Sequence, residues 1–87
     1  MKNNIIVYTS NTCAFCANAK NLLNDLNLPF EEINIQLDPE QRDIMLSKSN
    51  GQRTVPQIFI NANHVGGYTE LSQIVKNGKY KSFLVND

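Results

Sequence analysis

Cys13 and Cys16 are the two cysteines of the chain, and two residues separate them. Proteins use this spacing for thiol–disulfide exchange and for metal binding. A structural zinc ion needs four ligands, and outside the pair the chain offers only His64, which is expected to be a surface or turn residue. We therefore expect no metal and interpret the pair as a redox-active dithiol. An incidental pair is the remaining alternative, and the position of the two residues disfavours it.

That position is the junction between a predicted strand and a predicted helix. The first turn of a helix leaves backbone N–H groups unpaired, and together with the helix dipole they stabilise an anion. A cysteine placed there has a lowered thiol pKa and reacts as the thiolate. Cys13, at the tip, is predicted to be the exposed nucleophile that attacks a substrate disulfide. Cys16, one turn further along, is predicted to be the more buried thiol, and either Cys16 or an external thiol then attacks the Cys13 sulfur.

Hydrophobic patterns and turn residues predict the elements that hold this pair. Strands are expected over residues 4–9, 30–35 and 57–60, with a short fourth strand from residue 64. Helices are expected over residues 13–26, from residue 38 to about residue 49, and over residues 69–76, with a last helical turn over 80–84. The helix between the first two strands makes them parallel, and the short turn between the last two makes them antiparallel. The sequence thus predicts an α/β fold of order β-α-β-α-β-β-α, a four-stranded mixed sheet with helices on both faces.

The helices carry more specific expectations. The second starts at Asp38, which is expected to cap it, with Pro39 in the first helical position and Gln41 completing a capping box. That helix is expected to turn Ile44 and Met45 inward. The first helix has an apolar stripe of Phe15, Ala19, Leu22, Leu23 and Leu26. The third is expected to bury Leu71, Ile74 and Val75 and to end at Gly78.

Composition narrows the function class. The 87 residues are expected to form one domain over residues 1–87. The chain is 41% hydrophobic and 18% charged, which is too apolar for a disordered protein. Eight basic and eight acidic side chains balance, so neither nucleic acid nor a membrane surface is indicated as a partner. The apolar run over residues 5–7 is too short for a signal peptide or a membrane span, and two close cysteines point to chemistry in the cytoplasm.

Three further segments complete a recognisable pattern around the pair. They are Tyr8-Thr9, Thr54-Val55-Pro56-Gln57-Ile58-Phe59 and Gly66-Gly67-Tyr68-Thr69-Glu70-Leu71. In this order and spacing, together with Cys13-Ala14-Phe15-Cys16, they resemble the glutaredoxins over nearly the whole chain. The resemblance implies a thioredoxin-like fold and an enzyme, a glutathione-dependent oxidoreductase that reduces protein disulfides and glutathione mixed disulfides. It implies glutathione as co-substrate and disulfide-containing proteins as partners, and we expect a monomer.

The resemblance also assigns site residues. In the family the Thr-Val-Pro segment holds a cis-proline facing the cysteines, which implies a cis bond at Pro56 and leaves the Val55 backbone free to hydrogen-bond an extended glutathione or peptide strand. The Gly-Gly segment resembles the glutathione-binding turn, with Thr69 as the cap of the third helix and Glu70 as the partner of the ligand's ammonium group. Gln57 aligns with a position near the glycyl end of glutathione. The expected catalytic residues are Cys13 and Cys16, and the expected glutathione contacts are Phe15, Thr54, Val55, Pro56, Gln57, Gly67, Tyr68, Thr69 and Glu70.

Two departures from the family pattern leave alternatives open. Ala14-Phe15 stands where many members have Pro-Tyr, and Ser10 stands where a Lys or Arg commonly binds the glycine carboxylate; Arg53 and Arg42 are candidate substitutes. One alternative is a small redoxin reduced by thioredoxin reductase, although the Gly-Gly turn favours glutathione. The other is a binding module in which Cys13 and glutathione bridge a [2Fe–2S] cluster between two subunits, which loss of the active-site proline would favour.

Overall fold

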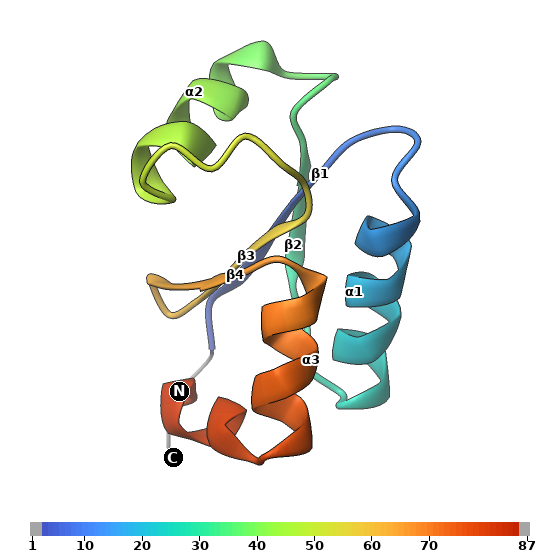
Figure 1. The fold of residues 1–87 in the computed structure, drawn as a ribbon, viewed down its shortest axis with the longest axis vertical. Helices are drawn as coiled ribbons and strands as arrows, with labels where there is room; N and C mark the ends of the chain where they lie inside the picture. Colours follow the sequence, from blue (N-terminus) through green and yellow to red (C-terminus); the bar gives the residue numbers. More distant parts are fainter. Residues whose placement is uncertain (1–2, 86–87) are drawn as a thin grey trace.

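The structure, a computed structural model, describes residues 3–85. Its strands are β1 (Ile5–Thr9), β2 (Glu31–Asn34), β3 (Gln57–Ile60) and β4 (Asn63–Gly66). Its helices are α1 (Ala14–Asp25), α2 (Pro39–Lys48) and α3 (Tyr68–Lys76), followed by the 3₁₀ turn η1 (Lys79–Phe83). The predicted element order is confirmed, and each predicted boundary lies within two residues of the observed one (Figure 1).

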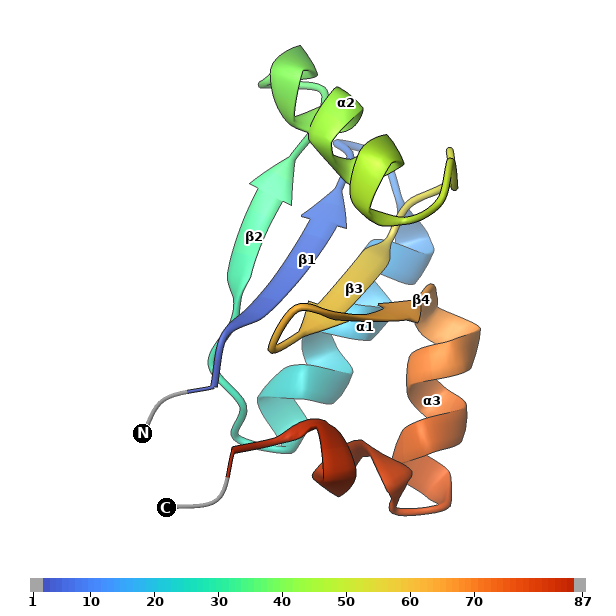
Figure 2. The ribbon, with the colours of Figure 1, turned by 90° about the vertical axis from the view of Figure 1, so that its left-hand side faces the viewer.

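The four strands form one mixed sheet in the order β2-β1-β3-β4 (Figure 2). β1 lies in the middle, parallel to β2 and antiparallel to β3, and β4 pairs antiparallel with β3. Tyr8 of β1 is opposite Ile33 on one side and Gln57 on the other. The predicted directions of the first and last strand pairs are therefore confirmed, and the Cys13 end of β1 is placed beside the start of β3.

α1 and α3 cover one face of the sheet, where the larger part of the core lies (Figure 1). Val7 and Ile58 come from the sheet, Ala19 and Leu23 from α1, and Leu71 from α3, and all of them are fully buried. Burying one aliphatic side chain of this size stabilises a fold by about 1.5–3 kcal/mol. This packing fixes the starts of α1 and α3 relative to each other at one end of the sheet.

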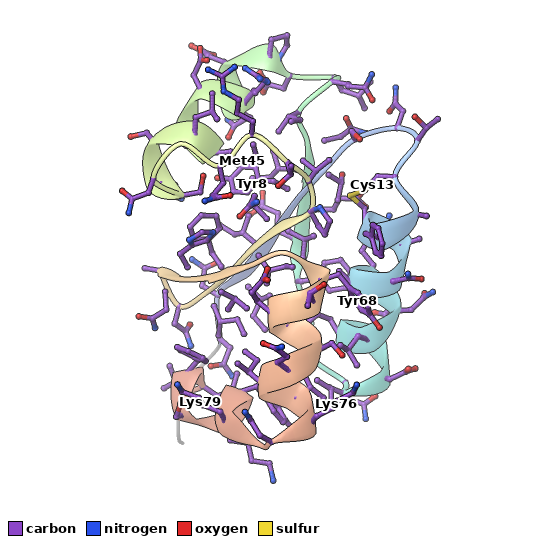
Figure 3. The ribbon with its side chains drawn as sticks, in the orientation of Figure 1. Tyr8, Cys13, Met45, Tyr68, Lys76 and Lys79 are labelled. Carbon is purple, nitrogen blue, oxygen red and sulfur yellow. A yellow bond between two sulfur atoms is a disulfide. The ribbon has the colours of Figure 1, made fainter. Side chains whose placement is uncertain are left out.

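α2 covers the opposite face with a smaller core. Met45, the buried residue of this helix, lies next to Tyr8 (Figure 3) and packs with it and with Ile35 and Phe59. The Tyr8 and Phe59 rings meet edge to face, with their centroids 5.7 Å apart. The expectation that Ile44 also turns inward is wrong, since its side chain is 40% exposed. Consecutive helical residues point about 100° apart, so a helix that buries Met45 leaves Ile44 at the edge.

The same geometry explains the position of Phe15. The buried residues of α1 are Cys16, Ala19 and Leu23, a stripe that starts one residue after Phe15. The phenyl ring is consequently 61% exposed and does not belong to the core stripe in which the sequence analysis placed it. It stacks instead on the ring of Tyr68 in α3.

The start of α2 also differs from the expectation. Pro39 is in the first turn as predicted, but the Asp38 carboxylate caps no backbone N–H, and the capping box with Gln41 is absent. Only the Asp38 carbonyl accepts the Gln41 N–H, at 3.0 Å. Asp38 is exposed, so water can satisfy the remaining N–H groups of this turn.

An ion pair ties α1 to β2. Lys20 donates to both carboxylate oxygens of Glu32 at 3.1 Å, and the buried Thr9 hydroxyl donates to Glu32 Oε2 at 2.8 Å. The Thr9 bond, with help from Lys20 and against the effect of partial burial, holds the pKa of Glu32 below its ordinary value of 4.5. None of the helices within residues 3–85 has the length and hydropathy that a membrane span requires.

Candidate active site

Cys13 occupies the N-cap position of α1. Its backbone is extended, with φ −138° and ψ 103°, and its sulfur accepts the backbone N–H of Cys16 at 3.1 Å. The sulfur thus takes the place of the oxygen that usually caps a helix, and it lies where N–H groups and the helix dipole favour negative charge. The predicted placement of Cys13 at a helix tip is confirmed (Figure 3).

The two cysteines are joined in a disulfide, with their Cα atoms 5.2 Å apart. Cys13 is half-buried, whereas Cys16 is 2% exposed and lies on the buried face of α1. An attacking group from solvent therefore reaches the Cys13 sulfur more easily than the Cys16 sulfur. This difference in exposure is the one expected for a nucleophile and a resolving thiol.

The segment before β3 lies against the Cys13 sulfur. The Val55–Pro56 bond is cis, as the family resemblance implied. The Val55 carbonyl oxygen is 3.6 Å from Cys13 Sγ, while Thr54 is exposed and Pro56 is buried. Besides its disulfide bond, the Cys13 sulfur contacts backbone groups of Cys16 and Val55.

The start of α3 forms the third side of the site. The N-cap is Gly67, so the expectation that Thr69 caps this helix is wrong: Thr69 is two residues inside it. Glu70 instead reaches back, and its Oε1 accepts the Gly67 N–H at 2.7 Å. Gly66 makes this possible, because its φ is +119° and a Cβ at this position would lie 2.9 Å from Glu70 Oε1.

A cavity of about 270 Å³ lies between these segments. Phe15 stacks on Tyr68 at its rim, with ring centroids 6.2 Å apart and an angle of 26°. The lining residues are Phe15, Thr54, Val55, Pro56, Gly67, Tyr68, Thr69 and Glu70. The fold therefore brings eight of the nine expected glutathione contacts around one hollow, although three separate segments of the chain supply them.

Gln57 is the ninth residue, and it does not line this cavity. It is buried, with 3% of its surface exposed. Its side-chain amide nitrogen donates to the carbonyl and hydroxyl oxygens of Thr54, and its Oε1 atom lies 2.7 Å from Nε2 of the His64 ring. Gln57 and His64 line a neighbouring cavity of about 310 Å³, which shares Thr54, Gly67 and Glu70 with the first.

Sequence reasoning missed His64 and Gln52, which line this second cavity. The signal available for His64 was the short turn between β3 and β4, which folds position 64 back toward position 57. A larger cavity of about 540 Å³ lies along β2 and the start of α2, and its lining shares no residue with the first cavity. Within residues 3–85, no group of three or more His, Cys, Asp or Glu side chains is arranged to hold a metal ion.

Comparison with known proteins decides the family. The glutaredoxin family model matches residues 5–65, which include both cysteines and the cis-proline. The chain belongs to the glutaredoxin family. It is 42% identical over 83 residues to glutaredoxin 1 of Rickettsia conorii, covering 94% of this chain and 81% of the relative. It is 40% identical over 75 residues to glutaredoxin 3 of Escherichia coli, covering 86% and 89%.

Solved glutaredoxin structures agree with this assignment. The solution structure of a Brucella melitensis glutaredoxin matches with a TM-score of 0.79 and 41% identity, covering 93% of this chain and 87% of that one. The crystal structure of a buckwheat glutaredoxin–glutathione complex matches with a TM-score of 0.83 and 27% identity, covering 94% and 76%. The fold is thioredoxin-like, and this glutaredoxin, with its CxxC pair, is a thiol–disulfide oxidoreductase.

Proposed function

We propose that this glutaredoxin uses glutathione to reduce protein disulfides and glutathione mixed disulfides, with Cys13 as nucleophile and Cys16 as resolving thiol. The observation that carries the proposal is the position of the Cys13 sulfur. It accepts an N–H in the first turn of α1 and is reachable from solvent. It also lies 3.6 Å from the carbonyl oxygen of Val55, one of the eight residues that line the cavity and that the family resemblance assigns to glutathione.

The first step is the same for both substrates. The Cys13 thiolate attacks one sulfur of the substrate disulfide, a new bond forms between the two sulfurs, and the other substrate sulfur leaves as a thiolate. The Cys16 N–H, which contacts the Cys13 sulfur, stabilises the attacking thiolate. Because Cys13 is half-buried and Cys16 is only 2% exposed, a substrate disulfide reaches the Cys13 sulfur first.

The second step differs between the substrates. With a glutathione mixed disulfide, Cys13 becomes bonded to glutathione, and a second glutathione thiolate displaces the Cys13 thiolate and forms oxidised glutathione. With a protein disulfide, the Cys16 thiolate attacks the Cys13 sulfur, releases the reduced substrate and leaves the Cys13–Cys16 disulfide, the state described above. Two glutathione thiols then restore the dithiol and leave as oxidised glutathione.

The cavity suggests how glutathione lies. The cysteinyl sulfur of glutathione meets the Cys13 sulfur. The extended backbone of glutathione pairs with the backbone of Val55, whose carbonyl oxygen lies 3.6 Å from the Cys13 sulfur. The γ-glutamyl carboxylate lies at the first turn of α3, where free N–H groups attract an anion. Glu70 is placed to bind the neighbouring ammonium group, since an ionised carboxylate can accept several bonds besides the one from Gly67. The glycyl carboxylate lies toward Gln57. Arg53 or Arg42 supplies the positive charge that is missing at Ser10.

A coupled assay tests the proposal. The chain is mixed with glutathione, glutathione reductase, NADPH and a small mixed disulfide of glutathione, and the loss of NADPH absorbance is followed. We expect turnover that depends on both the chain and glutathione. Turnover with thioredoxin reductase but none with glutathione would instead assign the protein to the redoxins that this reductase serves. An anaerobic visible spectrum of the reconstituted protein, expected to be colourless, tests the [2Fe–2S] alternative.

The proposed chemistry also suggests where and how the protein works. A dithiol that must return to its reduced form after each turnover needs a reducing compartment, and we propose the cytoplasm. We propose a monomer, because the cavity and both cysteines come from one chain. Size-exclusion chromatography with and without glutathione tests the monomer, and a dimer that forms only with glutathione would contradict it.

A further inference from the structure

The contacts of Gln57 define an unexpected link between β4 and the active-site segment. Its amide nitrogen donates to the Thr54 carbonyl oxygen at 3.0 Å and to the Thr54 hydroxyl at 3.3 Å. Its amide oxygen lies 2.7 Å from the Nε2 atom of His64. Thr54 precedes Val55, whose carbonyl oxygen is 3.6 Å from the Cys13 sulfur. A continuous series of contacts thus runs from a histidine on the edge strand to the reacting sulfur.

The orientation of the Gln57 amide is fixed by chemistry. A backbone carbonyl can only accept a hydrogen bond, so the amide atom that faces the Thr54 carbonyl must be the nitrogen. The oxygen then faces His64, and because this oxygen can also only accept, the Nε2 atom of His64 must carry the proton. In neutral His64 the proton therefore resides on Nε2 and not on Nδ1.

The ring of His64 is held in place from a second side. It stacks on Phe59, with ring centroids 4.9 Å apart and an angle of 29°. Phe59 itself is 3% exposed and belongs to the α2-side core. His64 is exposed to solvent, but its stacking on the buried Phe59 ring fixes the direction in which its Nε2 atom points.

We propose that His64 is a positioning residue, which acts through Gln57 to hold Thr54 and Val55 at the distance from Cys13 that substrate binding needs. The inference deepens the proposed function and rests on it, because the Val55 backbone is the group expected to pair with glutathione. Gln57 then acts on glutathione by fixing the segment that binds it, which agrees with its burial and with its absence from the first cavity.

The decisive variant is His64→Phe. A phenyl ring can keep the stacking on Phe59 and fill the same space, but it cannot donate to Gln57, which leaves a buried acceptor without its partner. Alanine would be less informative, because it would open this position to water. Since a misplaced Val55 weakens ground-state and transition-state binding equally, we expect the KM for the glutathione mixed disulfide to rise about two- to tenfold while kcat stays within about twofold.

Two further variants separate positioning from general damage. His64→Gln places an amide N–H near the former Nε2 position, and we expect it to restore the KM to within about twofold of the wild-type value. Asn63→Ala changes the neighbouring exposed residue of β4, which pairs with Ile60 and whose amide donates to the Asn61 carbonyl oxygen, and should leave KM unchanged. A His64→Gln variant as impaired as His64→Phe, or a His64→Phe variant with wild-type KM, would overturn the proposal.

A measurement without turnover keeps this inference separate from the proposed function. In the NMR spectrum of the oxidised protein, His64→Phe should shift the backbone amide signals of Thr54 and Val55, and the Asn63→Ala control should not. The His64 ring nitrogens of the unaltered protein should report the proton on Nε2. If the chain showed no glutathione-dependent turnover, the proposed function would fail, while these signals would still decide whether His64 positions the segment; unmoved amide signals would refute it.

Discussion

The helices on the two sides of the sheet begin in different ways. α1 begins at the sulfur of Cys13, and α3 begins at Gly67, whose N–H is bound by the Glu70 carboxylate. α2 begins at Asp38, which has the residue type of a cap but makes no side-chain cap bond. The two helix starts near the first cavity thus have a cysteine sulfur and a carboxylate as acceptors of their N–H groups, and the start with the more familiar capping sequence makes no side-chain cap bond.

This comparison shows that a helix start can serve two purposes at once. Every helix has N–H groups in its first turn that need an acceptor, and at α1 the Cys13 sulfur accepts one of them. A cysteine sulfur, unlike the oxygen of a usual cap, becomes a nucleophile when it ionises. At α3 the N–H groups of the first turn lie near the cavity, while the Glu70 carboxylate accepts the N–H of Gly67, the residue that leads into the helix. α1 and α3 share a core that fixes these two starts relative to each other, whereas α2 buries only Met45 against the other face.

The largest effect is expected from Cys13→Ser, which should abolish all thiol–disulfide exchange. Serine is itself a favoured N-cap, so its hydroxyl can accept the Cys16 N–H, and the fold should be retained. The coupled assay measures the loss, and thermal unfolding of the reduced proteins verifies the fold. The matched change at the other helix start, Asp38→Ala, should leave activity intact and change the free energy of unfolding by less than about 0.5 kcal/mol. Residual exchange in Cys13→Ser would mean that the reactive sulfur is at another helix position.

Cys16→Ser should remove one of the two activities. Reduction of a glutathione mixed disulfide needs only Cys13 and external glutathione, so this rate should stay within about tenfold of the wild-type rate. Reduction of a protein disulfide by the two-cysteine route should be lost, because no second thiol can release the substrate. Assays with both substrates on the same preparation separate these outcomes. If Cys16→Ser were inactive and Cys13→Ser active, the roles of the two sulfurs would have to be exchanged.

The two helix starts at the cavity were not equally predictable from sequence. A strand of β-branched and aromatic residues followed by Cys13 and an apolar stripe is a local pattern, and it placed the sulfur correctly at the tip of α1. The cap of α3 was wrongly assigned to Thr69, because the actual arrangement depends on the positive φ of Gly66 and on the path of Glu70 beside it. The cap expected at Asp38 is absent because the start of α2 is exposed, so that water can bind its N–H groups in place of a side chain.

Contacts between distant segments account for the remaining differences. Phe15 fits the apolar period of α1, but the stripe that meets the core begins at Cys16, and the ring stacks on Tyr68 instead. Gln57 is a polar residue in a strand, and nothing local indicates that His64 and Thr54 satisfy its amide and allow its burial. Sequence patterns therefore predicted the sheet, the helix order and the position of the Cys13 sulfur at the tip of α1, whereas the partners of polar side chains depend on the assembled fold.

Gly66→Ala tests the start of α3 and should have an intermediate effect. An added Cβ would need a disfavoured backbone angle and would collide with the Glu70 carboxylate, so we expect a loss of at least about 2 kcal/mol in the free energy of unfolding. Gly51→Ala is the matched control, since φ there is +83° and a Cβ would meet nothing within 4 Å; we expect a loss of about 1 kcal/mol. Urea unfolding of the three proteins measures both. Equal losses would mean that the Glu70 contact does not constrain this turn.

The smallest effect concerns the ion pair that ties α1 to β2. Because the pKa of Glu32 is lowered in the folded protein, its ionised form stabilises the fold above pH 4.5, and this contribution is lost as the pH falls through the lowered pKa. Glu32→Gln should therefore lower the free energy of unfolding near neutral pH by less than about 1 kcal/mol, since both side chains are about one-third exposed. At a pH well below 4.5 the variant and the wild type should converge. Glu31→Gln, on the same strand but without the Thr9 bond, is the control in urea unfolding across this range. If the wild type instead gained stability over the variant as the pH fell, the ionised form of Glu32 would destabilise the fold. The attachment of α1 to the sheet would then depend on packing alone.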